Sequence, residues 1–262
     1  MRSPRALVRV VLPPVAFGVA FLALWEAAVK VFDLKPYFLP PPSAIWEQFR
    51  GNVGLVWDAA SVSGTNALVG LIVGTVVGVA LSFALARFRL LNDLVTPLAI
   101  ALNAVPIFVL VAVFNNMFSI TSEVPRRLMV TLVVQFIVLV NVTRGLRQVE
   151  ATQLELMRSY AAGQLAILRK VRVPNAVPYL FTALRIAAPA SVITAFVSEY
   201  FGGSQNGLGS RIVGNIAISA NAAAWAYVFG ACLLGLAFFV AAVSLERVAT
   251  PGGVSSRGRD GA

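Results

Sequence analysis

Residues 145–177, GLRQVEATQLELMRSYAAGQLAILRKVRVPNAV, separate two apolar segments that each look able to cross a bilayer. The stretch holds five basic residues against two acidic ones, so it is excluded from hydrocarbon and is expected to face the cytoplasm. Residues 148–168 contain no proline and are rich in helix formers, until Pro174 and Pro178 break the pattern. We predict a helix, a tight bend near residues 161–163, a second short helix and re-entry into the membrane. A hairpin packed only on its own bundle is the alternative.

The spacing within this stretch resembles the EAA loop of ABC importer permeases. That pattern reads Glu-Ala-Ala, three residues, Gly, nine residues, an apolar residue, two further positions and Pro. Residues 155–174 fit this spacing without a gap. Leu156 and Met157 replace the paired alanines, and Ala161 stands at the glycine position, with Gly163 two positions later. Because Ala takes a positive φ at higher cost than Gly, this departure bears on the geometry of the turn.

Other stretches extend the resemblance over nearly the whole chain, namely residues 38–46, 184–187, 198–203 and 207–209. Together they resemble the permease branch that serves nitrate, sulfonate, taurine and pyrimidine-precursor importers. The resemblance implies an all-α membrane protein of a prokaryotic cell membrane. Its fold is then a six-transmembrane-helix bundle of the type I ABC importer permease kind, with a cytoplasmic EAA-like coupling loop at residues 145–177.

The resemblance also implies partners. Two copies of a separate ATPase bind ATP and Mg²⁺, an extracytoplasmic binding protein delivers a small solute, and a second permease copy, in a homodimer or as a relative, completes the pathway. This chain would then be a non-catalytic subunit without a cofactor of its own. The resemblance places the ATPase contact on the loop, at Glu155, Arg158, Ser159, Tyr160, Ala161, Gly163 and Pro174.

Composition independently indicates a polytopic membrane protein in one domain. The chain has 262 residues, 58% hydrophobic and 12% charged, with a mean hydropathy of +0.83, whereas soluble proteins average about 25% charged. We expect a transmembrane domain at residues 14–248, a cytoplasmic N-terminus at 1–13 and a disordered cytoplasmic tail at 249–262. One cysteine and no histidine exclude an internal disulfide, cysteine metal sites and histidine chemistry. The charge of +10 is scattered at the ends of apolar segments, so no nucleic acid is expected.

Six apolar stretches approach the length of about 20 residues that spans hydrocarbon. They lie at residues 14–31, 66–86, 97–114, 128–142, 179–198 and 224–245. Placing both termini inside puts most Lys and Arg residues on the cytoplasmic side, as the positive-inside rule requires.

Polar residues within two of these spans are candidates for the lining or gate of the pathway, because such residues tend to face the bundle interior. In the third span, Pro106 is expected to kink the helix. In the fifth span, Pro189 is expected to do so, with nearby hydroxyls satisfying the freed carbonyl. The candidates are Asn103, Pro106, Asn115, Asn116, Ser191, Thr194 and, at the outer end, Glu199. Amides bonded to a neighbouring helix, and a carboxylate reaching water, are the alternatives.

The second span contains a stripe of small residues at four-residue spacing, which allows close approach of another helix. This small-residue stripe consists of Gly70, Gly74, Gly78 and Ser82. We favour packing within the same subunit over a dimer seam.

Other classes of protein fit less well. Neither Lys30, Lys35 nor Lys170 precedes Ser or Thr, so the chain has no phosphate-binding P-loop. An ion-coupled secondary transporter would usually show inverted repeats and ionisable residues near the midplane. A membrane scaffold without an ATPase partner would not need so ordered a basic loop. The sequence therefore predicts the permease subunit of an ATP-driven importer.

Overall fold

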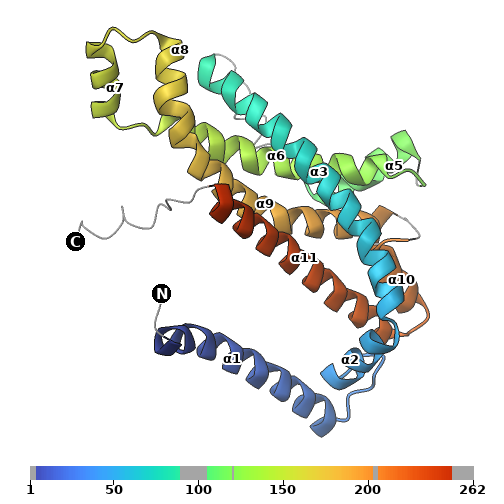
Figure 1. The fold of residues 1–262 in the computed structure, drawn as a ribbon. Helices are drawn as coiled ribbons and strands as arrows, with labels where there is room; N and C mark the ends of the chain where they lie inside the picture. The colour runs from blue at the N-terminus through green and yellow to red at the C-terminus, as the bar shows by residue number, and fades with distance from the viewer. Residues whose placement is uncertain (1–3, 89–104, 120, 203–205, 250–262) are drawn as a thin grey trace.

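The computed structural model describes residues 4–88, 105–119, 121–202 and 206–249, and over these residues it is helical with no strand (Figure 1). The predicted all-α class is confirmed. The elements are α1 (Pro4–Val31), α2 (Pro42–Gly51), α3 (Val53–Arg87), α5 (Ile107–Phe118), α6 (Val124–Arg147), α7 (Ala151–Ser159), α8 (Gln164–Ile167), a π-helical turn (Leu168–Arg172), α9 (Val173–Gly202), α10 (Leu208–Ala217) and α11 (Asn221–Ala249).

Five helical segments in the described part of the chain are long and apolar enough to cross a membrane. They are Leu12–Val31, Val53–Arg87, Val124–Arg147, Gln164–Gly202 and Asn221–Ala249. The first part of the predicted third span, including Asn103, lies outside the described residues, so the count of six stays a prediction. Helix α5 begins after Pro106, which has φ −59° and ψ 126°. Pro106 therefore lies directly before α5, and because residues 89–104 are outside the described part of the chain, the predicted kink stays a prediction.

Helix α3 begins at Val53, well before the predicted start of the second span at residue 66. The early turns carry hydroxyl residues that lower the hydropathy of the sequence, yet these side chains bond within the helix. Ser61 donates to the Asp58 carbonyl at 2.7 Å, and Thr65 donates to the Ser61 carbonyl at 2.7 Å. Local hydrogen bonds thus let a polar segment continue the membrane helix.

The small-residue stripe of α3 lies against α6 of the same chain. A Cβ added to Gly74 would lie 2.8 Å from the Thr131 carbonyl oxygen, and one added to Gly78 would lie 2.7 Å from the Gln135 carbonyl oxygen. Ser82 ends the stripe and donates to the Gly78 carbonyl at 2.7 Å. The two backbones approach closely because no side chain separates them.

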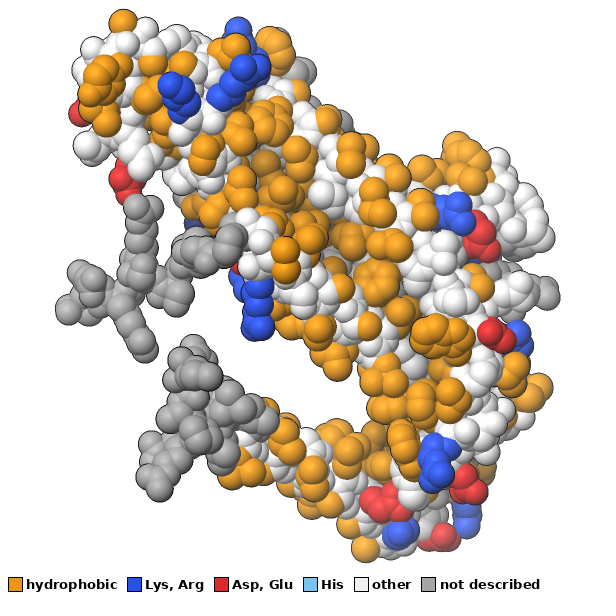
Figure 2. Space-filling model, viewed as in Figure 1, with side chains coloured by type: hydrophobic (Ala, Val, Ile, Leu, Met, Phe, Trp, Pro, Cys, Tyr) orange, Lys and Arg blue, Asp and Glu red, His pale blue; other side chains and the backbone are white. Residues whose placement is uncertain are grey.

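Helices α3, α6, α9 and α11 form the bundle, with α2 and α10 at one end and α7 and α8 at the other (Figure 1). The start of α1 and the end of α11 lie toward the α7 end. Helix α1 stands away from the bundle and joins it through α2 and a ring contact of 5.4 Å between Trp25 and Trp225. Hydrophobic side chains cover the flanks of the helices, while most charged ones gather toward the two ends (Figure 2).

Candidate coupling loop and outer polar centre

The loop at residues 145–177 projects from one end of the bundle, and its first helix is uncovered. None of the residues of α7 is buried, and the side chains of Leu156 and Tyr160 are 56% and 76% exposed. Arg158 is also exposed, while the Ser159 hydroxyl donates to the Leu156 carbonyl at 2.8 Å. The loop therefore presents two large apolar side chains, Leu156 on α7 and Tyr160 directly after it, that the described residues do not cover.

A left-handed residue ends α7. Ala161 has φ 51°, its N–H donates to the Arg158 carbonyl at 2.9 Å, and the Ala162 N–H donates to the Met157 carbonyl at 3.0 Å. This pair of bonds is the Schellman motif, in which glycine usually takes the left-handed position. Gly163 is extended, with φ −68° and ψ 164°, and precedes α8. The turn is therefore kept although Ala161 replaces the glycine.

Glu155 lies in the middle of α7. The helix begins at Ala151 after Glu150, so Glu155 does not lie at the helix start, where a carboxylate could cap the first backbone N–H groups. The helix starts earlier because Ala151 to Gln153 are compatible with helix and no proline intervenes. Glu155 is exposed, and its carboxylate is available to a partner.

The two stems of the loop are tied together at the bundle. The Asn175 side chain donates to the Gly145 carbonyl at 2.7 Å and to the Gln148 carbonyl at 2.9 Å, and the Tyr179 hydroxyl bonds the Gln148 side chain at 3.1 Å. A Cβ added to Gly145 would lie 2.8 Å from the Ala176 Cα. The end of α6 and the start of α9 are thus fixed to each other.

The helix that leaves the loop continues through two prolines. Gln164–Gly202 forms one helical stretch, so the expectation that Pro174 and Pro178 break it is wrong. A π-helical turn just before Pro174 closes with the Val173 N–H donating to the Leu168 carbonyl. This wider turn and the preceding helix let the chain pass a residue that has no N–H to donate.

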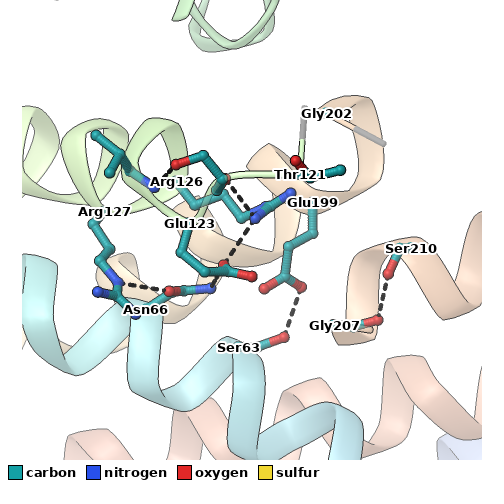
Figure 3. A network of polar contacts seen from close by, with 12 residues as sticks. Ser63, Asn66, Thr121, Glu123, Arg126, Arg127, Glu199, Gly202, Gly207 and Ser210 are labelled. Carbon is teal, nitrogen blue, oxygen red and sulfur yellow. Dashed lines mark hydrogen bonds and ion pairs between the residues drawn. The ribbon is translucent and has the colours of Figure 1, made fainter. Parts of the chain in front are cut away.

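A buried polar centre lies at the other end of the bundle, where α3, α9 and the start of α10 meet (Figure 3). Glu199 is fully buried, and its Oε2 accepts hydrogen bonds from the Ser63 hydroxyl at 2.6 Å and from the Gly209 N–H at 3.2 Å. The Leu208 N–H donates to the Ser63 oxygen at 2.9 Å. The alternative that Glu199 reaches water is therefore wrong, because residues 207–209 fold over it.

A second set of charges continues this centre onto α6. Arg126 is 1% exposed and pairs with Glu123 at 2.8 Å, and Figure 3 shows both residues in the same polar network as Glu199. The Asn66 side chain donates to Glu123 at 2.6 Å and accepts a bond from Arg127 at 3.0 Å. The carboxylate of Glu199 and the arginine of α6 thus share one low-dielectric site (Figure 3).

The remaining pathway candidates are dispersed. Asn115 on α5 donates to the Gly202 carbonyl at 3.1 Å, whereas Asn116 is exposed. Ser191 and Thr194 are buried and donate to the Ala188 and Ala190 carbonyls at 2.7 and 2.8 Å. Pro189 has no N–H, so the carbonyl that it leaves without a helical hydrogen bond is that of Arg185. Ser191 and Thr194 bond other carbonyls, so the expectation that they satisfy the freed carbonyl is wrong.

Two residues that form hydrogen bonds in these sites were not predicted from the sequence. Ser63 lies in a polar stretch that gave no sign of its burial, because its partner Glu199 is distant in the chain. Asn175 directly follows Pro174, the last residue of the EAA-like pattern. This position was the only feature of the sequence that could have indicated its role in tying the loop to the bundle. Within the described ranges, no three metal-ligating side chains of the His, Cys, Asp and Glu types gather.

An all-helical bundle in the described residues, with several candidate membrane spans and a basic loop projecting from one end, is the architecture of a polytopic membrane protein. The chain belongs to the family of inner-membrane components of binding-protein-dependent transport systems, whose family model matches residues 70–251. It is a permease subunit of an ABC importer, and the secondary transporter and scaffold alternatives are not favoured.

Similar proteins agree with this assignment. A probable ABC transporter permease protein of Haemophilus influenzae is 27% identical over 79% of this chain and 83% of its own length. A formylaminopyrimidine transport permease protein of Halalkalibacterium halodurans is 27% identical over 92% of this chain and 95% of its own length. A chain of the MetNI methionine ABC transporter, solved in inward-facing conformations, shares the fold with a TM-score of 0.55 at 21% identity, covering 76% of this chain and 95% of that one.

Proposed function

We propose that this permease is driven by a separate ATPase that docks on α7, and that it passes a small solute delivered by an extracytoplasmic binding protein. The observation that carries the proposal is the exposed surface of α7 and of Tyr160 directly after it, where Leu156 and Tyr160 lie beside the exposed charges of Glu155 and Arg158. An apolar anchor surrounded by charged residues is the usual composition of a protein interface.

The tied base of the loop supports a mechanical role. Asn175 and Tyr179 hold the end of α6 to the start of α9, so a displacement of α7 and α8 passes to two membrane helices. Helix α9 continues without interruption to Glu199 at the far end. Motion of the docked ATPase would thereby shift the equilibrium between two states of the bundle, which open the pathway to opposite sides of the membrane in turn.

The proposed assembly contains two copies of this chain, as a homodimer, with two ATPase subunits. ATP and Mg²⁺ bind the ATPase subunits, and this chain acts as a non-catalytic subunit without a cofactor. The loop, the start of α1 and the end of α11 face the cytoplasm, which agrees with the excess of Lys and Arg at that end. Outside the described residues, the tail at 250–262 is assigned to the same side.

Charge reversal in α7 tests the docking. Glu155→Lys leaves the fold intact because the side chain is exposed, so the permease should insert at normal levels. Its binding of the ATPase should weaken at least about tenfold, equivalent to about 1.4 kcal/mol. Substrate-stimulated ATP hydrolysis should fall with it. The measurements are recovery of the ATPase with the tagged permease in detergent and ATPase activity after reconstitution.

Glu47→Lys is the matched control, since Glu47 is an exposed carboxylate on α2 at the opposite end of the bundle. It should keep full recovery of the ATPase. If Glu155→Lys also keeps full recovery and transport, α7 is not the docking element.

A further inference from the structure

A small cavity lies at the root of the coupling loop, between the end of α3 and the beginning of the α8–α9 stretch. Its volume is about 130 Å³, well above the roughly 10–15 Å³ that a cavity needs to hold one water molecule. Its lining divides into an apolar part, Phe83, Ala86 and Leu168, and a polar part, Arg87, Arg172 and Gln164.

The two arginines of this cavity have no acidic partner among the described residues. The ion pairs of that part of the chain join other residues, and the guanidinium group of Arg87 lies over the ring of Phe88, 5.5 Å from its centre. Arg172 is half-buried, and neither Glu150 nor Glu155, the two acidic residues of the loop, lines the cavity or forms an ion pair with it. Within the described part of the chain, two positive charges therefore meet at one cavity without an acidic partner.

The position of the cavity, at the ends of two membrane-crossing segments, indicates which class of ligand it would bind. It lies where the membrane-crossing segment Val53–Arg87 ends and the segment Gln164–Gly202 begins. Phe83 and Ala86 belong to the last turns of the first segment, so the apolar lining continues into the hydrocarbon level. Basic pockets between membrane helices on the cytoplasmic side favour the phosphate of anionic lipids. A lipid satisfies both halves of the lining, because its phosphate meets the arginines while its chains follow the apolar wall.

We propose that this cavity binds the head group of an anionic phospholipid, with Arg87 and Arg172 holding the phosphate and Gln164 donating a further hydrogen bond. Arginine suits this role because its planar group donates two parallel hydrogen bonds to phosphate oxygens. The lipid bridges the end of α3 and the root of the coupling loop. Membrane composition thereby affects the position of the loop.

The test is lipid binding by the full-length permease in detergent, with phosphatidylglycerol as the probe and phosphatidylcholine as the neutral comparison. The wild type should bind phosphatidylglycerol at least about tenfold more tightly, since each cation near the surface contributes. The double variant Arg87→Gln with Arg172→Gln should lose this preference. Arg87 is exposed, so the single variant Arg87→Gln should keep the fold. It should weaken the binding of phosphatidylglycerol about threefold. This variant tests the proposal even if the double variant unfolds.

The control is Arg50→Gln with Arg211→Gln, which removes two exposed charges at the opposite end and should leave the preference unchanged. An equal loss in the control would overturn the site in favour of general charge attraction. Competition by glycerol phosphate as strong as that of the lipid would overturn the lipid assignment in favour of a soluble phosphate compound. Unchanged lipid binding with lost ATPase recovery would overturn it in favour of a protein contact.

Discussion

Ala161 shows how a single residue departs from the pattern of its family while the backbone keeps the turn. A non-glycine residue in the left-handed region costs roughly 1–2 kcal/mol, and at Ala161 two backbone hydrogen bonds hold it there. Glycine in turn loses more backbone freedom than alanine on folding, which costs about 0.4–1 kcal/mol. The balance favours glycine at this position.

Ala161→Gly should therefore stabilise the end of α7 by on the order of 0.5–1 kcal/mol. Amide hydrogen exchange at residues 161 and 162 should slow about two- to fivefold, because each opening of the turn becomes rarer. Ala162→Gly is the control, since Ala162 has a negative φ and gains nothing from the change. Equal or faster exchange in Ala161→Gly would show that the turn is not strained.

At the scale of elements, the close approach of α3 and α6 depends on the small-residue stripe. A Cβ at Gly74 would lie 2.8 Å from both the Thr131 carbonyl oxygen and the Val134 Cβ. Because Thr131 contributes backbone, no rotamer change relieves this contact, and the two helices must separate.

Gly74→Ala should destabilise the permease by about 1–3 kcal/mol, the usual cost of overpacking a core. Thermal unfolding of the protein in detergent measures this loss, together with the amount of folded permease in membranes. Gly235→Ala is matched in chemistry and also lies in a membrane helix, but nothing lies within 4 Å of its added Cβ. It should unfold like the wild type. The same midpoint for both variants would mean that the stripe does not set the helix spacing.

At the scale of the whole molecule, the arrangement of the helices places α8 and the start of α10 at opposite ends of the bundle (Figure 1). Single cysteines at Gln164 and Asn206, both exposed, report these two ends in a Cys232→Ala background. An impermeant maleimide added outside intact cells should label only Asn206→Cys. After permeabilisation both should react. Labelling of Gln164→Cys from outside would contradict the proposed orientation.

Much of the fold could be predicted because apolar length and charge position are local properties. The spans at 128–142, 179–198 and 224–245 lie within α6, the α9 stretch and α11. Element boundaries were less accurate where polar residues occur inside helices, as in α3, or where proline does not end one, as at Pro174 and Pro178. In both cases neighbouring carbonyls and hydroxyls satisfy the backbone, and hydropathy does not record this.

The sequence by itself determined the class of protein, the helical architecture and the basic loop, since composition and motif spacing need no information about contacts. Only the tertiary structure decided what Glu199 and the small-residue stripe do. Glu199 meets Ser63 and Gly209 through the folding of distant segments, and Gly74 meets α6. Burial and pairing depend on which helices come together, and that is a property of the whole chain, not of a local sequence window.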